Sequence, residues 1–145
     1  MPNQVPKLYS MPPTQNICIL AIDDTAINLF LIEQLIKKIC PEAKVLKSEN
    51  GEDGILKFKE NKVDLIFLDI QLPTIDGFET AQEIRQCEVD GSRTPIVALS
   101  GYEKEQLITN DDSKNMDDFL RKPIKMQSLE EIVNKFLAEE IKQSC

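Results

Sequence analysis

The segment Leu65-Ile66-Phe67-Leu68-Asp69 is a run of four apolar residues that ends in an aspartate. A continuous apolar run of this length, bounded by polar residues, is typical of a strand that is buried on both faces of a parallel sheet. In open parallel sheets, binding sites lie beyond the edge where the strands end. The segment therefore predicts a buried parallel strand, and it places Asp69 where a functional site is expected.

Four further segments are predicted to be strands, and polar residues follow three of them. These segments, with the polar residues that follow, are 17–22 with Asp23 and Asp24, 96–99 with Ser100, 118–121 with Lys122, and 43–46. Because parallel strands end at one edge of a sheet, we expect these polar side chains to gather in one region.

Segments with helical periodicity alternate with the strands. Helices are expected at residues 27–39, 51–60, 78–87, 103–109 and 129–141. The apolar residues expected to face the core are Ile27, Leu31, Ile32, Leu35, Ile36 and Ile39 in the first helix, Ile55, Leu56 and Phe58 in the second, and Leu129, Ile132, Val133, Phe136 and Leu137 in the last. Alternation of this kind implies parallel strands joined by right-handed crossovers. The predicted fold is an α/β, doubly wound sheet of five parallel strands flanked by five helices, of the flavodoxin-like type.

The length of 145 residues fits one domain. Residues 1–15 are polar and rich in proline, so we expect a flexible tail or linker ahead of a folded domain at residues 16–142. The net charge of −8 argues against direct nucleic-acid binding, which requires clustered Lys and Arg. No apolar run suits membrane insertion and no signal-peptide pattern opens the chain, so a cytoplasmic location is expected.

The chain has four cysteines and no histidine. No two cysteines form a C-x-x-C pair, so we interpret them as free thiols in a reducing compartment. The absence of histidine excludes Ser-His and Cys-His catalysis, histidine metal ligands and a phosphohistidine carrier. Any chemistry must therefore use carboxylates, hydroxyls, lysine or thiols.

Three carboxylates at neighbouring strand ends, those of Asp23, Asp24 and Asp69, repel one another unless a cation lies among them. Hard oxygen ligands in a site with few protein groups favour Mg²⁺. Ser100 can donate a hydrogen bond to a phosphoryl oxygen, and Lys122 can neutralise charge on a transferring phosphoryl group. An aspartate can itself be the nucleophile that forms an aspartyl phosphate.

Each of these residues also has a plainer interpretation. An aspartate of the first pair alone would most often cap a helix, Asp69 alone would begin a turn, Ser100 would belong to a turn with Gly101, and Lys122 would be a solvated charge. Their recurrence at the ends of four predicted strands favours a shared site.

Taken in order, these residues resemble the receiver domains of two-component response regulators, over about residues 16–141. The matching motifs are the acidic pair Asp23-Asp24, the segment 69–77 with its acceptor aspartate, proline and Asp-Gly, the hydroxyl residue Ser100, and the pair Lys122-Pro123. The spacings between them are near those usual in the family.

The resemblance implies that Asp69 takes a phosphoryl group from a phosphohistidine. Asp24, Asp69 and the backbone carbonyl of Gln71 would bind Mg²⁺, and Asp23 would help through water. Histidine kinases or histidine phosphotransfer proteins are the implied partners, together with a protein that senses phosphorylation. The implied role is that of a signalling switch and not that of an enzyme with a separate substrate.

The resemblance also implies that Ser100 and Lys122 hold the phosphoryl group, and that Ser100 and Phe119 form a conformational switch. For Phe119, ordinary core filling is an equal alternative. A cis Lys122–Pro123 bond is usual in the family.

The chain departs from the family pattern in a few places. Thr25 stands where many receivers have Asn, whereas Asn28 keeps a second polar position that is common in receivers of hybrid sensor kinases. Gly101 replaces a common alanine. Residues 110–113 are poor helix formers, so we expect a short fourth helix.

Three other functions compete with a phosphorylated receiver. A Mg²⁺-dependent hydrolase of the haloacid dehalogenase kind would need an acid where Gln71 stands. A flavodoxin-like FMN protein would need a hydroxyl- and glycine-rich loop after the first strand, where the acidic pair stands. A receiver-like interaction module that takes no phosphate would not need the full set of site residues that this chain retains.

Overall fold

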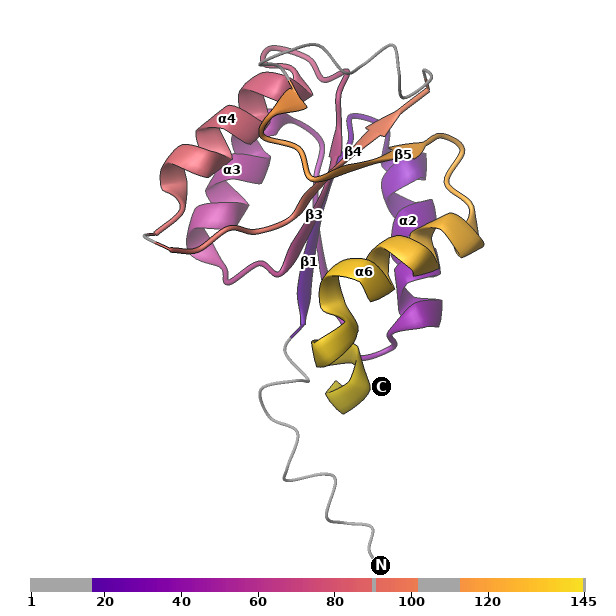
Figure 1. Cartoon of the computed structure of the whole chain (residues 1–145). Coiled ribbons are helices and arrows are strands. Elements are labelled where there is room, and N and C mark those ends of the chain that lie inside the picture. Colours follow the sequence, from indigo (N-terminus) through magenta and orange to yellow (C-terminus); the bar gives the residue numbers. More distant parts are fainter. Residues whose placement is uncertain (1–16, 90, 102–112, 145) are drawn as a thin grey trace, which may run out of the picture.

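The computed structural model describes residues 17–89, 91–101 and 113–144, the last six of these by their backbone alone. Five strands form one parallel sheet in the order β2-β1-β3-β4-β5 (Figure 1). The strands are β1 (Cys18–Ile22), β2 (Lys44–Ser48), β3 (Leu65–Asp69), β4 (Ile96–Ser100) and β5 (Asp118–Arg121). The predicted parallel, doubly wound sheet is thus confirmed. Its three central strands are fully buried, as their continuous apolar runs indicate.

Four helices lie within the described residues, on the two faces of the sheet. They are α2 (Ala26–Ile39), α3 (Gly51–Glu60), α4 (Gly77–Cys87) and α6 (Met126–Ser144). Figure 1 shows α2 and α6 together on one side of the sheet and α3 and α4 on the other. Each pair closes over its own apolar cluster. The helix predicted at residues 103–109 and the tail predicted at residues 1–15 lie outside the described residues.

The inward faces of two helices differ from the prediction. In α2, Leu29, Ile32 and Ile36 are buried, whereas Ile27 and Leu31 are about half exposed. Only one narrow stripe of a helix can face a sheet, and an α2 that is apolar on more than one side cannot bury all of its apolar residues. In α3, Gly51 and Gly54 face the core, and Leu56 is exposed. The stripe predicted for α6 is confirmed.

The turn between β3 and α4 is fixed by local chemistry. Asp76 caps α4: its Oδ1 accepts from the backbone N–H of Glu79 at 2.9 Å, and the Glu79 carboxylate accepts from the backbone N–H of Asp76 at 2.9 Å. Gly77 then lies directly against β3, because a Cβ there would overlap the carbonyl oxygen of Asp69 and lie 2.6 Å from the Cα of Ile70. This close approach holds the chain after Asp69 near the end of β3.

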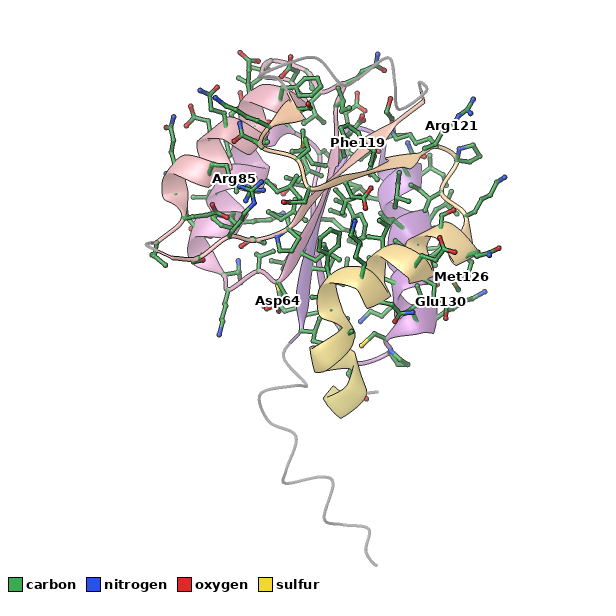
Figure 2. The ribbon with its side chains drawn as sticks, viewed as in Figure 1. Asp64, Arg85, Phe119, Arg121, Met126 and Glu130 are labelled. Atoms are coloured by element: carbon green, nitrogen blue, oxygen red, sulfur yellow. The ribbon has the colours of Figure 1, made fainter. Side chains whose placement is uncertain are left out.

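A charged network anchors β5 at the opposite end of the sheet. The guanidinium of Arg85, which is labelled in Figure 2 near the end of α4, pairs with Glu88 at 2.7 Å and with Asp117 at 2.8 Å. All three side chains are largely buried. Asp117 also accepts from the backbone N–H of Ile96 at 2.8 Å, so it ties the start of β5 to the start of β4. Such pairs are costly to break, so the network fixes the strand that leads to Lys122.

The described helices include none whose length and apolar character would allow it to cross a membrane. Cys18, Cys40 and Cys87 are present as thiols, and the fourth cysteine lies outside the described residues.

Candidate functional site

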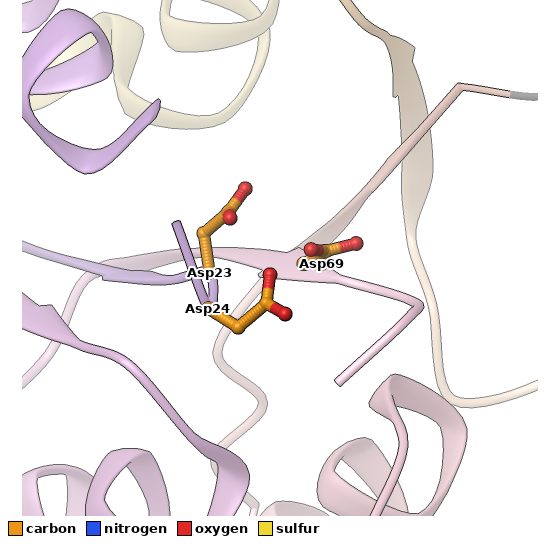
Figure 3. Close-up of side chains that lie close together, drawn as sticks. All are labelled: Asp23, Asp24 and Asp69. Atoms are coloured by element: carbon orange, nitrogen blue, oxygen red, sulfur yellow. The ribbon is translucent and has the colours of Figure 1, made fainter. Parts of the chain in front are cut away.

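Three carboxylates meet at the carboxyl edge of the sheet. Asp23 and Asp24 follow β1, and Asp69 ends β3, the neighbouring strand. One oxygen from each lies within 4.8 Å of the others, and Figure 3 shows the three side chains gathered at this edge. Asp23 and Asp69 are 1% and 4% exposed, whereas Asp24 faces solvent. The structure therefore brings together the acidic residues that the strand pattern predicted.

Lys122 completes the cluster from the loop after β5. Its Nζ lies 2.9 Å from Asp23 Oδ2 and 3.1 Å from Asp69 Oδ2. Its backbone N–H donates to the carbonyl oxygen of Ser100 at 2.7 Å, which holds the loop against the end of β4. The Lys122–Pro123 bond is cis, as the resemblance implied.

The electrostatics follow from this packing. Burial and the nearby charge of Asp23 raise the pKa of Asp69 above its usual range, although the backbone N–H of Gln71 and the ammonium of Lys122 act in the opposite direction. Burial by itself lowers the pKa of Lys122, but Asp23 and Asp69 outweigh burial and raise it overall. Lys122 is therefore held in its positively charged form. The free-energy cost of ionising the buried Asp69 is only partly offset by Gln71 and Lys122.

Asp23 receives two further contacts that the sequence analysis did not assign. Its Oδ1 accepts from the backbone N–H of Thr25 at 2.9 Å, and the side-chain amide of Asn28 lies 3.4 Å from each carboxylate oxygen. In the sequence, Asn28 is distinguished only by its resemblance to a polar position of receivers in hybrid sensor kinases. The signal for a role was its position, since a polar residue three places into a helix can reach back past the helix start.

The remaining predicted residues lie around this cluster. Ser100 ends β4, the strand beside β3, and is buried. Gln71 donates its backbone N–H to Asp69 Oδ1 at 3.0 Å, and its carbonyl as a metal ligand remains a prediction. Phe119, labelled in Figure 2, is half-buried against the cluster beneath α3 and α4. That packing fits core filling, and the switch role remains a prediction.

The donor set suits a hard divalent cation. The converging side chains are carboxylates, with no imidazole or thiolate among the described residues of the cluster. Two of the carboxylates are buried, and a cation would offset the burial and repulsion that disfavour ionised Asp69. Oxygen-only ligands with one side open to solvent are typical of Mg²⁺.

Comparisons with a family model and with known proteins place this chain in the same family. The family model for the response regulator receiver domain matches residues 19–134. The sensor histidine kinase GacS of Pseudomonas protegens is 36% identical over 124 residues, which cover 81% of this chain and 13% of GacS. The chain therefore spans only a small part of the length of that relative.

Two solved structures are similar over most of the chain. A two-component response regulator from Clostridium difficile is 29% identical, with a TM-score of 0.74, and the match covers 85% of this chain and 97% of that one. The receiver domain of a Pseudomonas aeruginosa sensor histidine kinase is 26% identical, with a TM-score of 0.70, covering 86% and 99%. The second structure has a magnesium ion coordinated in its active site cleft.

Proposed function

This chain belongs to the response regulator receiver domain family, and we propose that it accepts a phosphoryl group on Asp69 with the help of Mg²⁺. The observation that carries the proposal is the ammonium of Lys122, which lies within ion-pair distance of two buried carboxylates at the end of β1 and β3. A buried acid beside a fixed cation provides both a nucleophile and a partner for the charge of a phosphoryl group.

Asp23, Asp24, Asp69 and the backbone carbonyl of Gln71 are the groups that would hold Mg²⁺. The ion would supply positive charge to the oxygens of the phosphoryl group. The magnesium ion in the Pseudomonas aeruginosa receiver supports this assignment.

In the proposed reaction, an oxygen of Asp69 attacks the phosphorus of a phosphohistidine. The new O–P bond forms as the P–N bond breaks, and the imidazole leaves with the electron pair and takes up a proton. The Lys122 ammonium shifts from Asp69 to a phosphoryl oxygen, and the Ser100 hydroxyl donates to another. We propose that this last contact, together with rearrangement of Phe119, switches the surface that a partner protein recognises.

The phosphodonor must lie on another domain or protein, because this chain contains no histidine. A histidine kinase or a histidine phosphotransfer protein fits the curated relative, which is a sensor histidine kinase. We assign the receiver to residues 16–142, with residues 1–15 as a tail or linker, and we place the protein in the cytoplasm with its donor.

The surface of α2 beside the site is suited to that donor. Ile27, Phe30 and Leu31 are 59%, 53% and 51% exposed, although all three are large and apolar. They follow Asp24 by one or two helical turns, so a protein that brings a histidine to Asp69 can cover them at the same time. A contribution from the helix expected at residues 103–109 lies outside the described residues.

The proposal is tested by incubation with acetyl phosphate and measurement of the intact mass. With MgCl₂ the wild-type protein should gain one phosphoryl group, and EDTA should abolish the gain. The Asp69→Asn variant should gain none. Equal labelling of this variant, or labelling that survives chelation, would show that the assignment is wrong. A wild-type protein that is never labelled would instead fit a receiver-like interaction module.

A further inference from the structure

The start of α2 differs from the starts of α3 and α4. In α3, the N-cap Asn50 accepts from the backbone N–H of Asp53 at 2.7 Å, and α4 begins with a full capping box. In α2, the N-cap Thr25 makes no side-chain capping bond. Its backbone N–H is bound by the carboxylate of Asp23, a residue of the site. The Thr25 hydroxyl instead donates to Asp24 Oδ1 at 3.3 Å, so the start of α2 is tied to both members of the acidic pair.

Asn28 occupies the position of α2 that completes a capping box. A polar side chain there ordinarily bonds back to the N-cap N–H. That N–H is already bound by Asp23, and the Asn28 amide lies 3.4 Å from both oxygens of the same carboxylate. These contacts are long for hydrogen bonds, whereas the Nζ of Lys122 lies only 2.9 Å from Asp23 Oδ2. A pocket of about 80 Å³, lined in part by Asp23, Asn28 and Lys122, leaves room for the amide to adjust.

We propose that Asn28 is a positioning residue that holds the Asp23 carboxylate in place when Lys122 leaves it. The inference rests on the proposed function, in which Lys122 moves to the phosphoryl group. Asp23 then loses its only charged donor among the described residues. A buried carboxylate that loses a hydrogen-bond donor tends to turn toward other donors or solvent, because its desolvation is no longer offset. The neutral amide of Asn28 keeps Asp23 oriented toward the metal site without competing for its charge.

The test is Mg²⁺ binding, measured by isothermal titration calorimetry with MgCl₂ alone. The Asn28→Leu variant keeps the size of the side chain and removes its donor. Outer-sphere partners of metal ligands typically change metal affinity by 10-fold or more, so we expect about a tenfold weaker affinity. Gln34→Leu, which removes an exposed amide from the same helix, is the matched control and should bind as the wild type does.

A second arm separates positioning from helix capping. In the Lys122→Met background, Asn28 is the remaining side-chain donor to Asp23, so Asn28→Leu should reduce Mg²⁺ affinity by a larger factor than in the wild type. The urea midpoint of Asn28→Leu, measured without Mg²⁺, should stay at the wild-type value.

Unchanged Mg²⁺ affinity in both backgrounds would overturn the inference. So would an affinity loss accompanied by a lower urea midpoint, because that result would assign Asn28 to the helix. A wild-type protein that binds no Mg²⁺ would instead refute the proposed function itself.

Discussion

Lys122 shares its ammonium between two buried carboxylates, with Nζ 2.9 Å from Asp23 Oδ2 and 3.1 Å from Asp69 Oδ2. The loop after β5 is therefore tied to the ends of β1 and β3 by charge as well as by the sheet. The ammonium contacts carboxylates that are also needed for the proposed functions: both would help to hold Mg²⁺, and Asp69 would accept the phosphoryl group. A charge that enters the site therefore acts on Lys122 as well as on the two carboxylates.

Removal of the Lys122 ammonium should strengthen cation binding and weaken phosphorylation. In Lys122→Met, Asp23 and Asp69 lose their positive partner, so Mg²⁺ should bind roughly tenfold more tightly. Labelling by acetyl phosphate should become slower, because the partner of the phosphoryl oxygens is gone. Calorimetry and a labelling time course measure the two effects. Lys125→Met, which removes an exposed lysine nearby, controls for net charge, and equal effects of the two variants would contradict the account.

Asp69 should make stability depend on pH in an unusual direction. Its pKa is raised in the folded protein, so between the ordinary and the raised value the folded state binds the proton more readily than the unfolded chain. Wild-type protein without metal should lose stability as pH rises through that window, and Asp69→Asn should not. The variant should therefore resist urea better at neutral pH, and its advantage should vanish below about pH 4. An equal advantage for Asp24→Asn, an exposed acid of the same cluster, would point to net charge instead.

The exposed apolar face of α2 should affect the rate of phosphorylation only when the phosphodonor is a protein. Ile27→Ser together with Phe30→Ser should slow transfer from a phosphorylated histidine phosphotransfer domain on the order of tenfold or more, since burying such side chains contributes about 1.5–3 kcal/mol each. Labelling by acetyl phosphate should stay unchanged. Leu56→Ser removes an equally exposed apolar side chain from α3 and is the matched control. If transfer to the Leu56→Ser variant were slowed to the same extent, an interface on α2 would be refuted.

Gly77 should be required for the geometry of the segment that carries Gln71. A Cβ at position 77 would overlap the backbone of Asp69 and Ile70, so Gly77→Ala must displace β3 or α4. We expect a loss of roughly 1–3 kcal/mol in the free energy of unfolding, together with weaker Mg²⁺ binding. Urea denaturation and calorimetry report the two. Among the described residues, a Cβ on Gly101 meets no atom within 4 Å, so Gly101→Ala should leave stability near the wild-type value.

The sequence was sufficient for the sheet and for the acidic cluster, because both depend on short-range patterns. An apolar run such as 65–68 predicts a strand that is buried on both faces, and the aspartate that follows it marks the edge of the sheet where the strand ends. It was less informative for helix orientation. Ile27 and Leu31 fit an apolar stripe, but periodicity alone could not show that Leu29, Ile32 and Ile36 would occupy the face toward the sheet.

Contacts of residues that do not follow a strand end could not be predicted from the sequence pattern. Arg85 and Asp117 form an ion pair although they are 32 residues apart in the chain, and neither lies in a motif that marks it as buried. The role of Asn28 was similarly hidden. Its amide would normally serve its own helix, and only the structure shows that Asp23 has taken the N–H of Thr25 and left the amide facing the carboxylate.

The most direct test of the account locates the phosphoryl group within the chain. Protein labelled with acetyl phosphate and MgCl₂ is treated with borohydride, which reduces an acyl phosphate to the alcohol and so converts the modified aspartate to homoserine. Peptide mass spectrometry then identifies the converted position. The account predicts homoserine at position 69 alone, and none in protein labelled in the presence of EDTA. Homoserine at Asp23 or Asp24, or no conversion in protein that carries the phosphoryl mass, would contradict the claim that Asp69 is the acceptor.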